Sequence, residues 1–438
     1  MKETKVVKFG GSSLADAKQF KKVAEIILDD PTRRFVVASA PGKRYVEDIK
    51  VTDMLYKCYE MASEGQNFDE QFQMIKDRYN NIIMDLGIED FSLEEDFEII
   101  KGAFSHMAGR DYAASRGEFL NSKYLGFEFI DAAKYIFFDD MGQFDWDKTA
   151  EKLIPKLATT EKAVVPGFYG SMPNGTIKTF SRGGSDVTGS IIARAAEAKI
   201  YENWTDVSGC LICDPRIVNN PAPINTITYS ELRELAYMGA TVLHEDAIFP
   251  VRAAGIPVNI KNTNCPQDRG TMIVSETAEP CEHIITGIAG KKGMSVINIE
   301  KDKMNSEVGF GRNVLRALEK SNVSFEHMPS GVDTMSVVIQ TDKLAGKETT
   351  ILDEIRSRVH PDQLYIESNL ALIAVVGRGM KSARGTAAIL FTALADARVN
   401  IKMIDQGSSE LNIIIGVAEE DFEVAMKAIY NAFIKVKK

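Results

Sequence analysis

The chain has 438 residues, more than a single hydrophobic core usually supports, so its length predicts two or three domains. Hydrophobic residues make up 45% and charged residues 26%, which is typical of globular proteins, and the formal net charge of −10 argues against nucleic acid or an anionic membrane as a partner. No apolar run approaches the ~18 residues of a transmembrane helix, no secretory segment opens the chain and the five cysteines form no disulfide pattern, so we expect a cytoplasmic protein.

Strands and helices alternate through the first part of the chain. A strand is expected at residues 6–9, a helix with apolar residues at i, i+3, i+4 and i+7 runs through residues 20–27, and a second buried strand covers residues 34–40. Residues 53–125 are expected to be mostly helical, and further strands are expected at residues 163–165, 176–180, 199–204, 258–260 and 271–274. This alternation predicts an α/β domain with a mostly parallel sheet between helices, ending near residue 280.

The rest of the chain contains an internal repeat. Two stretches align without a gap at an offset of 76 residues, the distance from Gly309 to Gly385. Identical pairs at this offset include Met304/Met380, Ser306/Ser382, Ala317/Ala393, Leu318/Leu394, Val323/Val399 and Gly331/Gly407. Each copy follows the order strand, glycine loop, helix, strand, glycine turn, strand. This order predicts two ferredoxin-like α+β units.

A glycine pair follows the first strand, in the run Lys8-Phe9-Gly10-Gly11-Ser12-Ser13. Adjacent glycines let backbone N–H groups approach phosphate oxygens, and the start of the next helix adds partial positive charge. Lys8 would bring a full charge to a phosphoryl group in transfer. A glycine pair after a strand is also a common turn. Walker A and complete GxGxxG motifs are absent, so neither a P-loop nor a dinucleotide site is expected.

A second glycine turn joins a strand to a helix, in the run Phe180-Ser181-Arg182-Gly183-Gly184-Ser185-Asp186. Arg182 is suited to hold a carboxylate or phosphate through two parallel hydrogen bonds. Asp186 falls in the first helical turn, where helix capping is the alternative role. The motif therefore predicts an anion site if the loop reaches the same edge of the sheet as Lys8.

A third motif, Thr205-Asp206-Val207-Ser208-Gly209, follows a strand and is itself followed by Asp214-Pro215-Arg216. Its position suits ribose or purine recognition at the carboxyl edge of a sheet, with a solvated turn as the alternative. The adjacent Cys210 and Cys213 form a single CxxC without a second pair, and the five histidines lack metal-ligand spacing. We therefore expect no metal site built by the protein alone.

These motifs occur together and in a fixed order: KFGGSS from Lys8, VVASAPGK from Val36, VTD from Val51, SRGE from Ser115, SRGGSD from Ser181, TDVSG from Thr205 with DPR from Asp214, and YSELRELAYMGATVLHEDA from Tyr229. In this combination the chain resembles the aspartate kinase family, a branch of the amino-acid kinase superfamily, over essentially its whole length. The resemblance implies an amino-acid-kinase domain at residues 1–280 and two ACT-type regulatory domains. In the family the first ACT unit is inserted into the second, which predicts residues 291–366 for the first and residues 284–290 with 367–438 for the second. No homoserine dehydrogenase module follows, so we expect a monofunctional enzyme.

The resemblance also implies the reaction and the roles of several residues. The γ-phosphoryl group of ATP would pass to the β-carboxylate of L-aspartate, which needs no general base because a carboxyl group with a pKa of about 3.9 is already ionised. Lys8 would face the transferring phosphoryl group, and Arg182 would hold a carboxylate of aspartate. Glu118 and Asp186 would bind the substrate ammonium group. The predicted aspartate-binding residues are Ser39, Thr52, Glu118, Arg182 and Asp186.

On the nucleotide side, Mg²⁺ would bridge the ATP phosphates with few or no protein ligands. The predicted nucleotide-binding residues are Lys8, Gly10, Gly11, Ser12, Thr205, Asp206, Leu211, Arg216 and Thr241. Thr241 stands where the family commonly has a lysine, so we expect Arg216 to be the nucleotide-side cation. Leu211 stands where an aromatic residue is often found, so we expect only apolar contacts with adenine.

ACT units of this family usually pair across a two-fold axis and hold a small amino acid, which predicts a homo-oligomer, with a dimer as the expected form. The first repeat carries Glu307 and Asp333 where the second has Ala383 and Ser409. A basic effector needs acidic partners, so we expect lysine, alone or together with threonine, to inhibit from the first repeat. The predicted effector-binding residues are Met304, Asn305, Glu307, Gly309, Phe310, Ser330, Gly331, Asp333 and Thr334.

Two other functions fit part of the sequence. An amino-acid kinase acting on glutamate or N-acetylglutamate would share the glycine loops, but such kinases usually lack the SRGE segment and a tandem ACT tail. A non-catalytic ACT amino-acid sensor would keep the fold and lose the reaction. The intact residues Lys8, Glu118, Arg182 and Asp186 argue against the sensor.

Overall fold

The computed structural model describes residues 3–181, 183–240, 243, 245–277 and 283–434. The chain divides into two compact units. The first comprises Met1–Cys210, Pro223–Tyr229 and Val242–Thr277, and the second comprises Leu211–Ala222, Ser230–Thr241 and Ala278–Lys438. Over the described ranges, every helix is either too short or too polar to cross a membrane.

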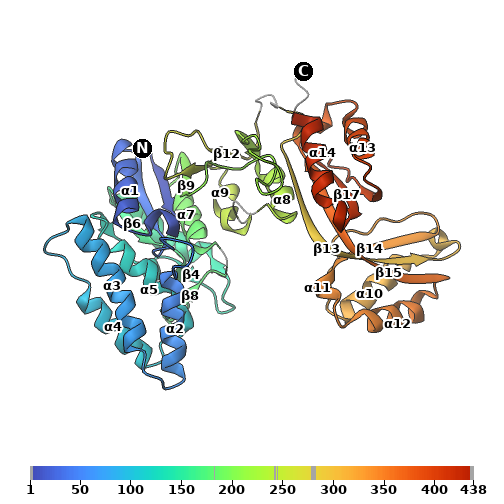
Figure 1. The fold of residues 1–438 in the computed structure, drawn as a ribbon. Helices are drawn as coiled ribbons and strands as arrows, with labels where there is room; N and C mark the ends of the chain where they lie inside the picture. Colours follow the sequence, from blue (N-terminus) through green and yellow to red (C-terminus); the bar gives the residue numbers. More distant parts are fainter. Residues whose placement is uncertain (1–2, 182, 241–242, 244, 278–282, 435–438) are drawn as a thin grey trace. The chain divides into compact units, whose positions relative to one another are not determined.

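The first unit is organised around an eight-stranded sheet with the order β10-β12-β11-β9-β1-β2-β6-β3 (Figure 1). Its strands are β1 (Lys5–Phe9), β2 (Arg33–Ala38), β3 (Glu128–Phe129), β6 (Ala163–Pro166), β9 (Ile200–Thr205), β10 (Thr226–Thr228), β11 (Val258–Asn262) and β12 (Thr271–Val274). All neighbours are parallel except β11 and β12, which pair antiparallel. The predicted mostly parallel sheet is confirmed. Because β1, β2, β6 and β9 run the same way, their carboxyl ends meet at one edge.

Helices cover this sheet and build most of the core of the unit. Their bounds are α1 (Ala17–Asp29), α2 (Val51–Ser63), α3 (Asp69–Leu86), α4 (Glu94–Ser105), α5 (Arg110–Ser122), α6 (Trp146–Thr159), α7 (Gly184–Ala195) and α9 (Phe249–Ala253), with 3₁₀ turns at Gly11–Leu14, Ala132–Lys134 and Glu245–Ile248. Helices α2 to α5 lie together (Figure 1) and account for the predicted helical stretch. Phe9, Leu55, Tyr79 and Phe97 are fully buried in their shared core. A small sheet, β5-β4-β7-β8, is formed by Phe144–Asp145, Phe137–Phe138, Tyr169–Ser171 and Ile177–Thr179.

The second unit contains a five-stranded antiparallel sheet with the order β14-β13-β15-β17-β16. Its strands are β13 (Gly287–Glu300), β14 (Thr334–Gln340), β15 (Gln363–Val376), β16 (Ile401–Asp405) and β17 (Asn412–Ala418). The helices are α8 (Tyr229–Tyr237), α10 (Phe310–Lys320), α11 (Thr341–Leu344), α12 (Glu348–Val359), α13 (Thr386–Asp396) and α14 (Phe422–Ile434), with 3₁₀ turns at Met304–Ser306, Arg378–Lys381 and Glu419–Asp421. The expected α/β fold with ferredoxin-like α+β units is confirmed.

The two repeats share this sheet through the long strand β13. Residues 287–291 of β13 pair with residues 372–376 of β15, while residues 294–300 pair with β14 and with residues 363–370 of β15. The first half of β13 therefore pairs within the second repeat, and the second half of β13 pairs within the first repeat. Helices α10 and α13 begin and end at equivalent positions, in keeping with the offset of 76. The boundaries of 1–280 for the first domain, 291–366 for the first repeat and 284–290 with 367–438 for the second stay predictions.

Candidate active site

Loops from neighbouring parallel strands meet at the carboxyl edge of the large sheet. The amide of Gly10, after β1, donates to the carbonyl of Trp204 at the end of β9, at 3.0 Å. The amide of Ser39, after β2, donates to the carbonyl of Phe9 at 3.2 Å, and that of Gly167, after β6, donates to the carbonyl of Ala38 at 3.0 Å. These hydrogen bonds place the first glycine motif beside the loops that follow β2, β6 and β9.

Close packing requires the second glycine of the pair after β1, Gly11, and Gly42 opposite it. The Gly42 amide donates to the Gly11 carbonyl at 2.8 Å, and a Cβ at Gly42 would lie 2.6 Å from the carbonyl carbon of Gly11. A Cβ at Gly11 would lie 2.9 Å from the carbonyl oxygen of Ala40. The helix start expected at this loop is a 3₁₀ turn over Gly11–Leu14, and α1 begins only at Ala17. Backbone amides and Lys8, rather than the α1 dipole, are left to attract an anion at this loop.

Lys8 lies in a buried polar cluster with residues of α7 and β9. Its Nζ is 2.6 Å from Oδ1 of Asp186, and the two side chains are only 10% and 18% exposed. Asn203 stands opposite Lys8 in the register of β1 and β9, and its Nδ2 donates to Oδ1 of Asp186 at 2.9 Å. The N-cap of α7 is Gly183, so the Asp186 carboxylate holds Lys8 instead of capping the helix. Sequence reasoning missed Asn203, although an asparagine inside a buried strand was a signal for it.

Glu118 on α5 is a buried carboxyl group with an unused oxygen. The residue is 5% exposed, and its Oε2 has no hydrogen-bond partner among the described residues. Burial raises the pKa of Glu118 to about 8, although a hydrogen bond from the backbone amide of Ala40 works in the opposite direction. A buried carboxyl oxygen without a partner is costly in a folded protein, so Glu118 is suited to a cationic ligand group.

The predicted neighbours of Glu118 lie around it. A Cβ at Gly117 would lie 2.7 Å from the Cβ of Ala40 and 3.8 Å from Oγ1 of Thr52, so α5 packs closely on the loop after β2 and on the start of α2. Asn121, one helical turn after Gly117, donates from Nδ2 to the carbonyl of Ser39 at 2.7 Å. The structure thus brings together the segments that carry Ser39, Thr52 and Glu118. Arg182 lies outside the described residues.

The predicted nucleotide residues fall in both units. In the first unit, the Thr205 carbonyl accepts a hydrogen bond from the Thr263 amide at 2.9 Å, and Oγ1 of Thr205 lies 3.1 Å from Oδ1 of the exposed Asp206. Ser12, on the glycine loop, is partly exposed. Leu211 and Arg216 belong to the second unit, where the Arg216 side chain is 84% exposed and pairs with Asp214 at 2.6 Å. Thr241 lies outside the described residues.

The predicted effector residues form two joined loops in the first repeat. The Asn305 amide donates to the Val332 carbonyl at 3.0 Å, and the Gly331 amide donates to the Thr334 carbonyl at 2.7 Å. Oδ1 of Asp333 accepts a hydrogen bond from the Lys303 amide at 2.8 Å, and Glu307 pairs with Lys301. Met304 and Phe310 are buried, Ser330 forms an isolated β-bridge with Met335, and Gly309 caps α10 with a φ of +86°. Both predicted acids therefore already have partners.

A Mg²⁺ ion at this edge would be held mainly by the phosphate groups of a ligand and not by side chains of the protein. Across the described ranges, no three His, Cys, Asp or Glu side chains gather in a way that could hold a metal. The carboxylate of Asp186, which contacts Lys8 of the first glycine motif, is already paired with Lys8 and Asn203. At this edge the arrangement can hold phosphate beside Lys8 and a cation beside Glu118.

Comparisons with known proteins agree with this geometry. The amino acid kinase family matches residues 3–262, and the ACT domain family matches residues 373–433. Aspartokinase 3 from Bacillus subtilis (strain 168) is 39% identical over 447 residues, covering 98% of each chain.

Solved structures give the same result over nearly the whole chain. The crystal structure of Clostridium acetobutylicum aspartate kinase matches with a TM-score of 0.90 and 55% identity, covering 98% of this chain and 100% of that one. E. coli aspartokinase III matches at 26% identity in two states, covering 98% of this chain and 99% of that one. Its complex with aspartate and ADP (R-state) has a TM-score of 0.75, and its complex with lysine and aspartate (T-state) has one of 0.73.

Proposed function

Because the chain belongs to the amino acid kinase family and, within it, to the aspartokinases, we propose that it transfers the γ-phosphoryl group of ATP to the β-carboxylate of L-aspartate. The products are 4-phospho-L-aspartate and ADP. The observation that carries the proposal is the unpartnered Oε2 of buried Glu118, at the sheet edge that also holds Lys8. An ammonium group is the natural partner of that oxygen, and a phosphate is the natural partner of Lys8.

The chemistry at this edge is mainly positioning and charge. The acceptor carboxylate is ionised at neutral pH, so no residue has to remove a proton from it. The difficulty is to bring two anions together, and Lys8 offsets the charge that develops on the transferring phosphoryl group. Asp186 and Asn203 fix the Lys8 ammonium in place, so little reorganisation is needed during transfer. Glu118 orients aspartate by its α-ammonium group, with Ser39 and Thr52 beside it and Arg182 assigned to a substrate carboxylate.

The nucleotide binds beside Gly10 at the amides of Gly11 and Ser12, with Thr205 and Asp206 on its ribose side. The nucleotide-binding roles of Leu211, Arg216 and Thr241 remain predictions. A Mg²⁺ ion bound together with ATP would supply neutralisation of the phosphate charge. No step requires a residue of this chain to act as a metal ligand.

Regulation by an end product is the second part of the proposal. Lysine, alone or with threonine, inhibits from the first repeat, supported by the lysine complex of E. coli aspartokinase III. The acids Glu307 and Asp333 would exchange their present partners for the ligand ammonium groups. A homodimer through the ACT-type repeats, a cytoplasmic location and a place at the first step toward lysine, threonine and methionine remain predictions.

Trapping the product tests the reaction. The purified chain with Mg-ATP and one amino acid at a time should release ADP and form a hydroxylamine-reactive acyl phosphate with L-aspartate only. L-Glutamate and N-acetyl-L-glutamate are the competing acceptors, and the Lys8→Ala variant gives the background from contaminating kinases. Acyl phosphate formed from glutamate, or from none of the three, would contradict the proposal.

A further inference from the structure

Thr263 lies between two of the loops that the proposed function assigns to the nucleotide. It follows directly after β11, whose last residue, Asn262, pairs with Thr205 in the parallel register of β11 and β9. The loop after β11 therefore begins at the same edge of the sheet as the loops after β1 and β9. Thr263 is only 1% exposed, and none of the sequence motifs includes it.

Thr263 makes one hydrogen bond to each of these two loops. Its amide donates to the carbonyl of Thr205 at 2.9 Å, on the ribose side of the proposed site. Its Oγ1 shares a hydrogen bond of 2.7 Å with Oγ of Ser13, in the first glycine motif. The amide of Ser13 donates to the carbonyl of Gly10 at 3.0 Å, so Ser13 is part of the turn at the glycine pair. One buried residue thus joins the phosphate side of the proposed site to its ribose side.

The residues on either side of Thr263 are anchored as well. Asn262 donates from Nδ2 to Oγ of Ser208 at 3.0 Å, in the third motif. Asn264 accepts a hydrogen bond at Oδ1 from Nζ of Lys22, on α1, at 2.7 Å. All of these residues belong to the first unit. Because the loop is held at both ends, Thr263 has little freedom to follow a partner that moves away.

The hydroxyl pair of Thr263 and Ser13 is shielded from water. Both residues are 1% exposed, so loss of one hydroxyl group leaves the other, among the described residues, without a hydrogen-bond partner. The glycine loop and the end of β9 would then lose the side-chain contact that links them through Thr263. Two loops with a fixed spacing bind a ligand that spans them at a smaller ordering cost than two loops that move independently.

In the proposed site the nucleotide is such a ligand, with its phosphates beside Gly10 and its ribose beside Thr205. We propose that Thr263 is a positioning residue for the nucleotide, which fixes the spacing between the first glycine motif and the end of β9. It acts through Ser13 and Thr205 and not by contact with the ligand. This inference rests on the nucleotide site of the proposed function.

Removal of the hydroxyl group alone tests this role. Thr263→Val keeps the shape of the side chain and should raise the Kd for Mg-ADP, measured by isothermal titration calorimetry, and KM for ATP about tenfold each. KM for aspartate should change less than about twofold. Thr263→Ser restores the hydroxyl group and should recover the Kd for Mg-ADP to within about threefold of the wild type.

The partner hydroxyl group gives a second test. Ser13→Ala should weaken Mg-ADP binding to a similar extent as Thr263→Val. Because both substitutions break the same hydrogen bond, the double variant should bind Mg-ADP no more than about twofold more weakly than either single variant. Losses that multiply in the double variant would show two independent effects and would overturn the proposal. Should Thr263→Val fail to fold, normal binding of Mg-ADP by Ser13→Ala would overturn it as well.

The matched control is Thr149→Val, on α6. Thr149 is fully buried, and its Oγ1 accepts a hydrogen bond from the Phe137 amide at 3.0 Å. Thr149→Val should lower Tm and leave the Kd for Mg-ADP unchanged. If Thr263→Val behaves like this control, or reduces the use of ATP and aspartate equally, its role is structural only and the proposal is wrong.

The binding of Mg-ADP does not depend on the acceptor, which separates this inference from the proposed reaction. A chain that shows the expected pattern of Mg-ADP binding but phosphorylates no aspartate overturns the proposed reaction alone. A chain that phosphorylates aspartate and binds Mg-ADP equally well with and without the Thr263 hydroxyl group overturns the positioning role alone.

Discussion

The catalytic edge of the first unit and the predicted effector loops of the first repeat hold their charged side chains in opposite environments. At the sheet edge, Lys8 and Glu118 are buried, one held by an aspartate and an asparagine and the other left with an unpaired oxygen. In the effector loops, Asp333 is exposed and Glu307 is partly exposed. Buried ionisable groups are held in a fixed geometry, and removing one of them is costly, whereas an exposed charged group contributes little to folding stability. Changes at the sheet edge should therefore damage turnover, and changes in the repeats should alter regulation alone.

The largest expected effect is at Lys8. Lys8→Ala removes the charge next to the transferring phosphoryl group and should lower kcat roughly 10²–10³-fold, with much smaller changes in either KM. Steady-state kinetics with varied ATP and varied aspartate separates the change in kcat from the changes in the two KM values. The control is Lys18→Ala, an exposed lysine of α1, which should behave as the wild type. A near-native kcat in Lys8→Ala would show that the glycine loop does not lie at the reaction centre.

Glu118 should give the next largest effect, and on aspartate rather than on ATP. Glu118→Gln keeps the size of the side chain but replaces the ion pair with the substrate ammonium by a neutral amide. The expected loss in kcat/KM for aspartate is roughly 10- to 100-fold, with KM for ATP little changed. The exposed Glu98→Gln on α4 is the matched control. An unaltered kcat/KM for aspartate would show that the ammonium group binds elsewhere.

The first repeat should show the opposite behaviour. Asp333→Ala should leave the uninhibited kcat nearly intact and raise the inhibitory lysine concentration at least about tenfold. Ser409→Ala, at the equivalent position of the second repeat, should change lysine inhibition much less. Dose–response curves for lysine at fixed aspartate measure both variants. Full lysine sensitivity in Asp333→Ala, or no inhibition of the wild type by lysine, would end the assignment of lysine to the first repeat.

The smallest effect is expected at Arg216, which is exposed and paired only with Asp214. An exposed cation in water contributes little to phosphate binding, so Arg216→Ala should raise KM for ATP by no more than about fivefold. The effect should shrink further in high salt. A large loss in kcat would instead place Arg216 at the transferring phosphoryl group. It would contradict the expectation that exposed charged residues matter less for turnover than buried ones.

Much of the fold follows from the sequence because its signals are local. Alternating strands and helices predicted the parallel sheet, and the offset of 76 predicted two helices that begin and end in register, at Phe310–Lys320 and Thr386–Asp396. The continuity of β13 was not predictable in this way. Lys291-Lys292-Gly293 resembles a turn, and Gly293 has a φ of +76°, but pairing with β15 on both sides carries the strand through this irregularity.

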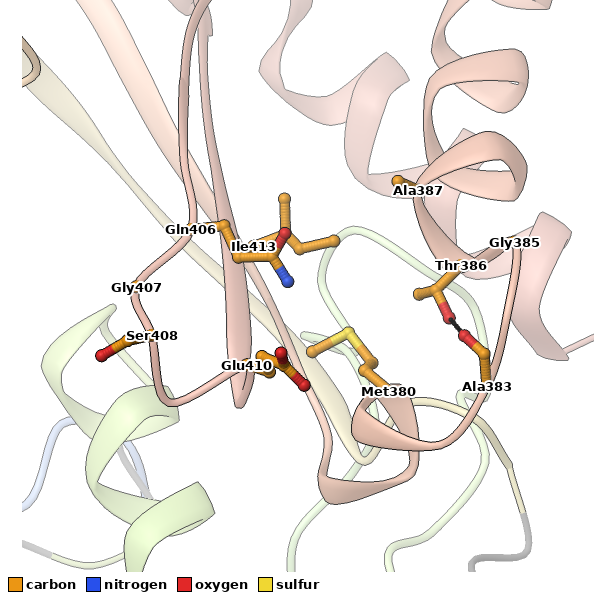
Figure 2. A pocket seen from close by; sticks show the side chains of 10 residues that line it. All are labelled: Met380, Ala383, Gly385, Thr386, Ala387, Gln406, Gly407, Ser408, Glu410 and Ile413. Carbon is orange, nitrogen blue, oxygen red and sulfur yellow. Dashed lines mark hydrogen bonds between the residues drawn. The ribbon is translucent and has the colours of Figure 1, made fainter.

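The site was predictable only in part, because its partners are set by register and by size. Lys8, Glu118 and Asp186 stand in motifs, whereas Asn203 joins them only because β1 and β9 pair with Lys8 opposite Asn203. In the repeats, sequence comparison weighed charge and favoured the acids at Glu307 and Asp333. It did not weigh the change from a phenylalanine at position 310 to Thr386, which lines a pocket in the second repeat (Figure 2).

The most direct test of the central claim, that Glu118 receives the substrate ammonium, is the number of protons released when aspartate binds. Burial raises the pKa of Glu118 to about 8, so the free enzyme carries this carboxyl group mostly protonated at pH 7. Pairing with the ammonium requires the ionised form and lowers the pKa again, so binding expels the proton. Calorimetric titrations at pH 7 in two buffers of different ionisation enthalpy should show release of about one proton by the wild type and almost none by Glu118→Gln. Equal proton release by both proteins, or none by the wild type, would contradict the account.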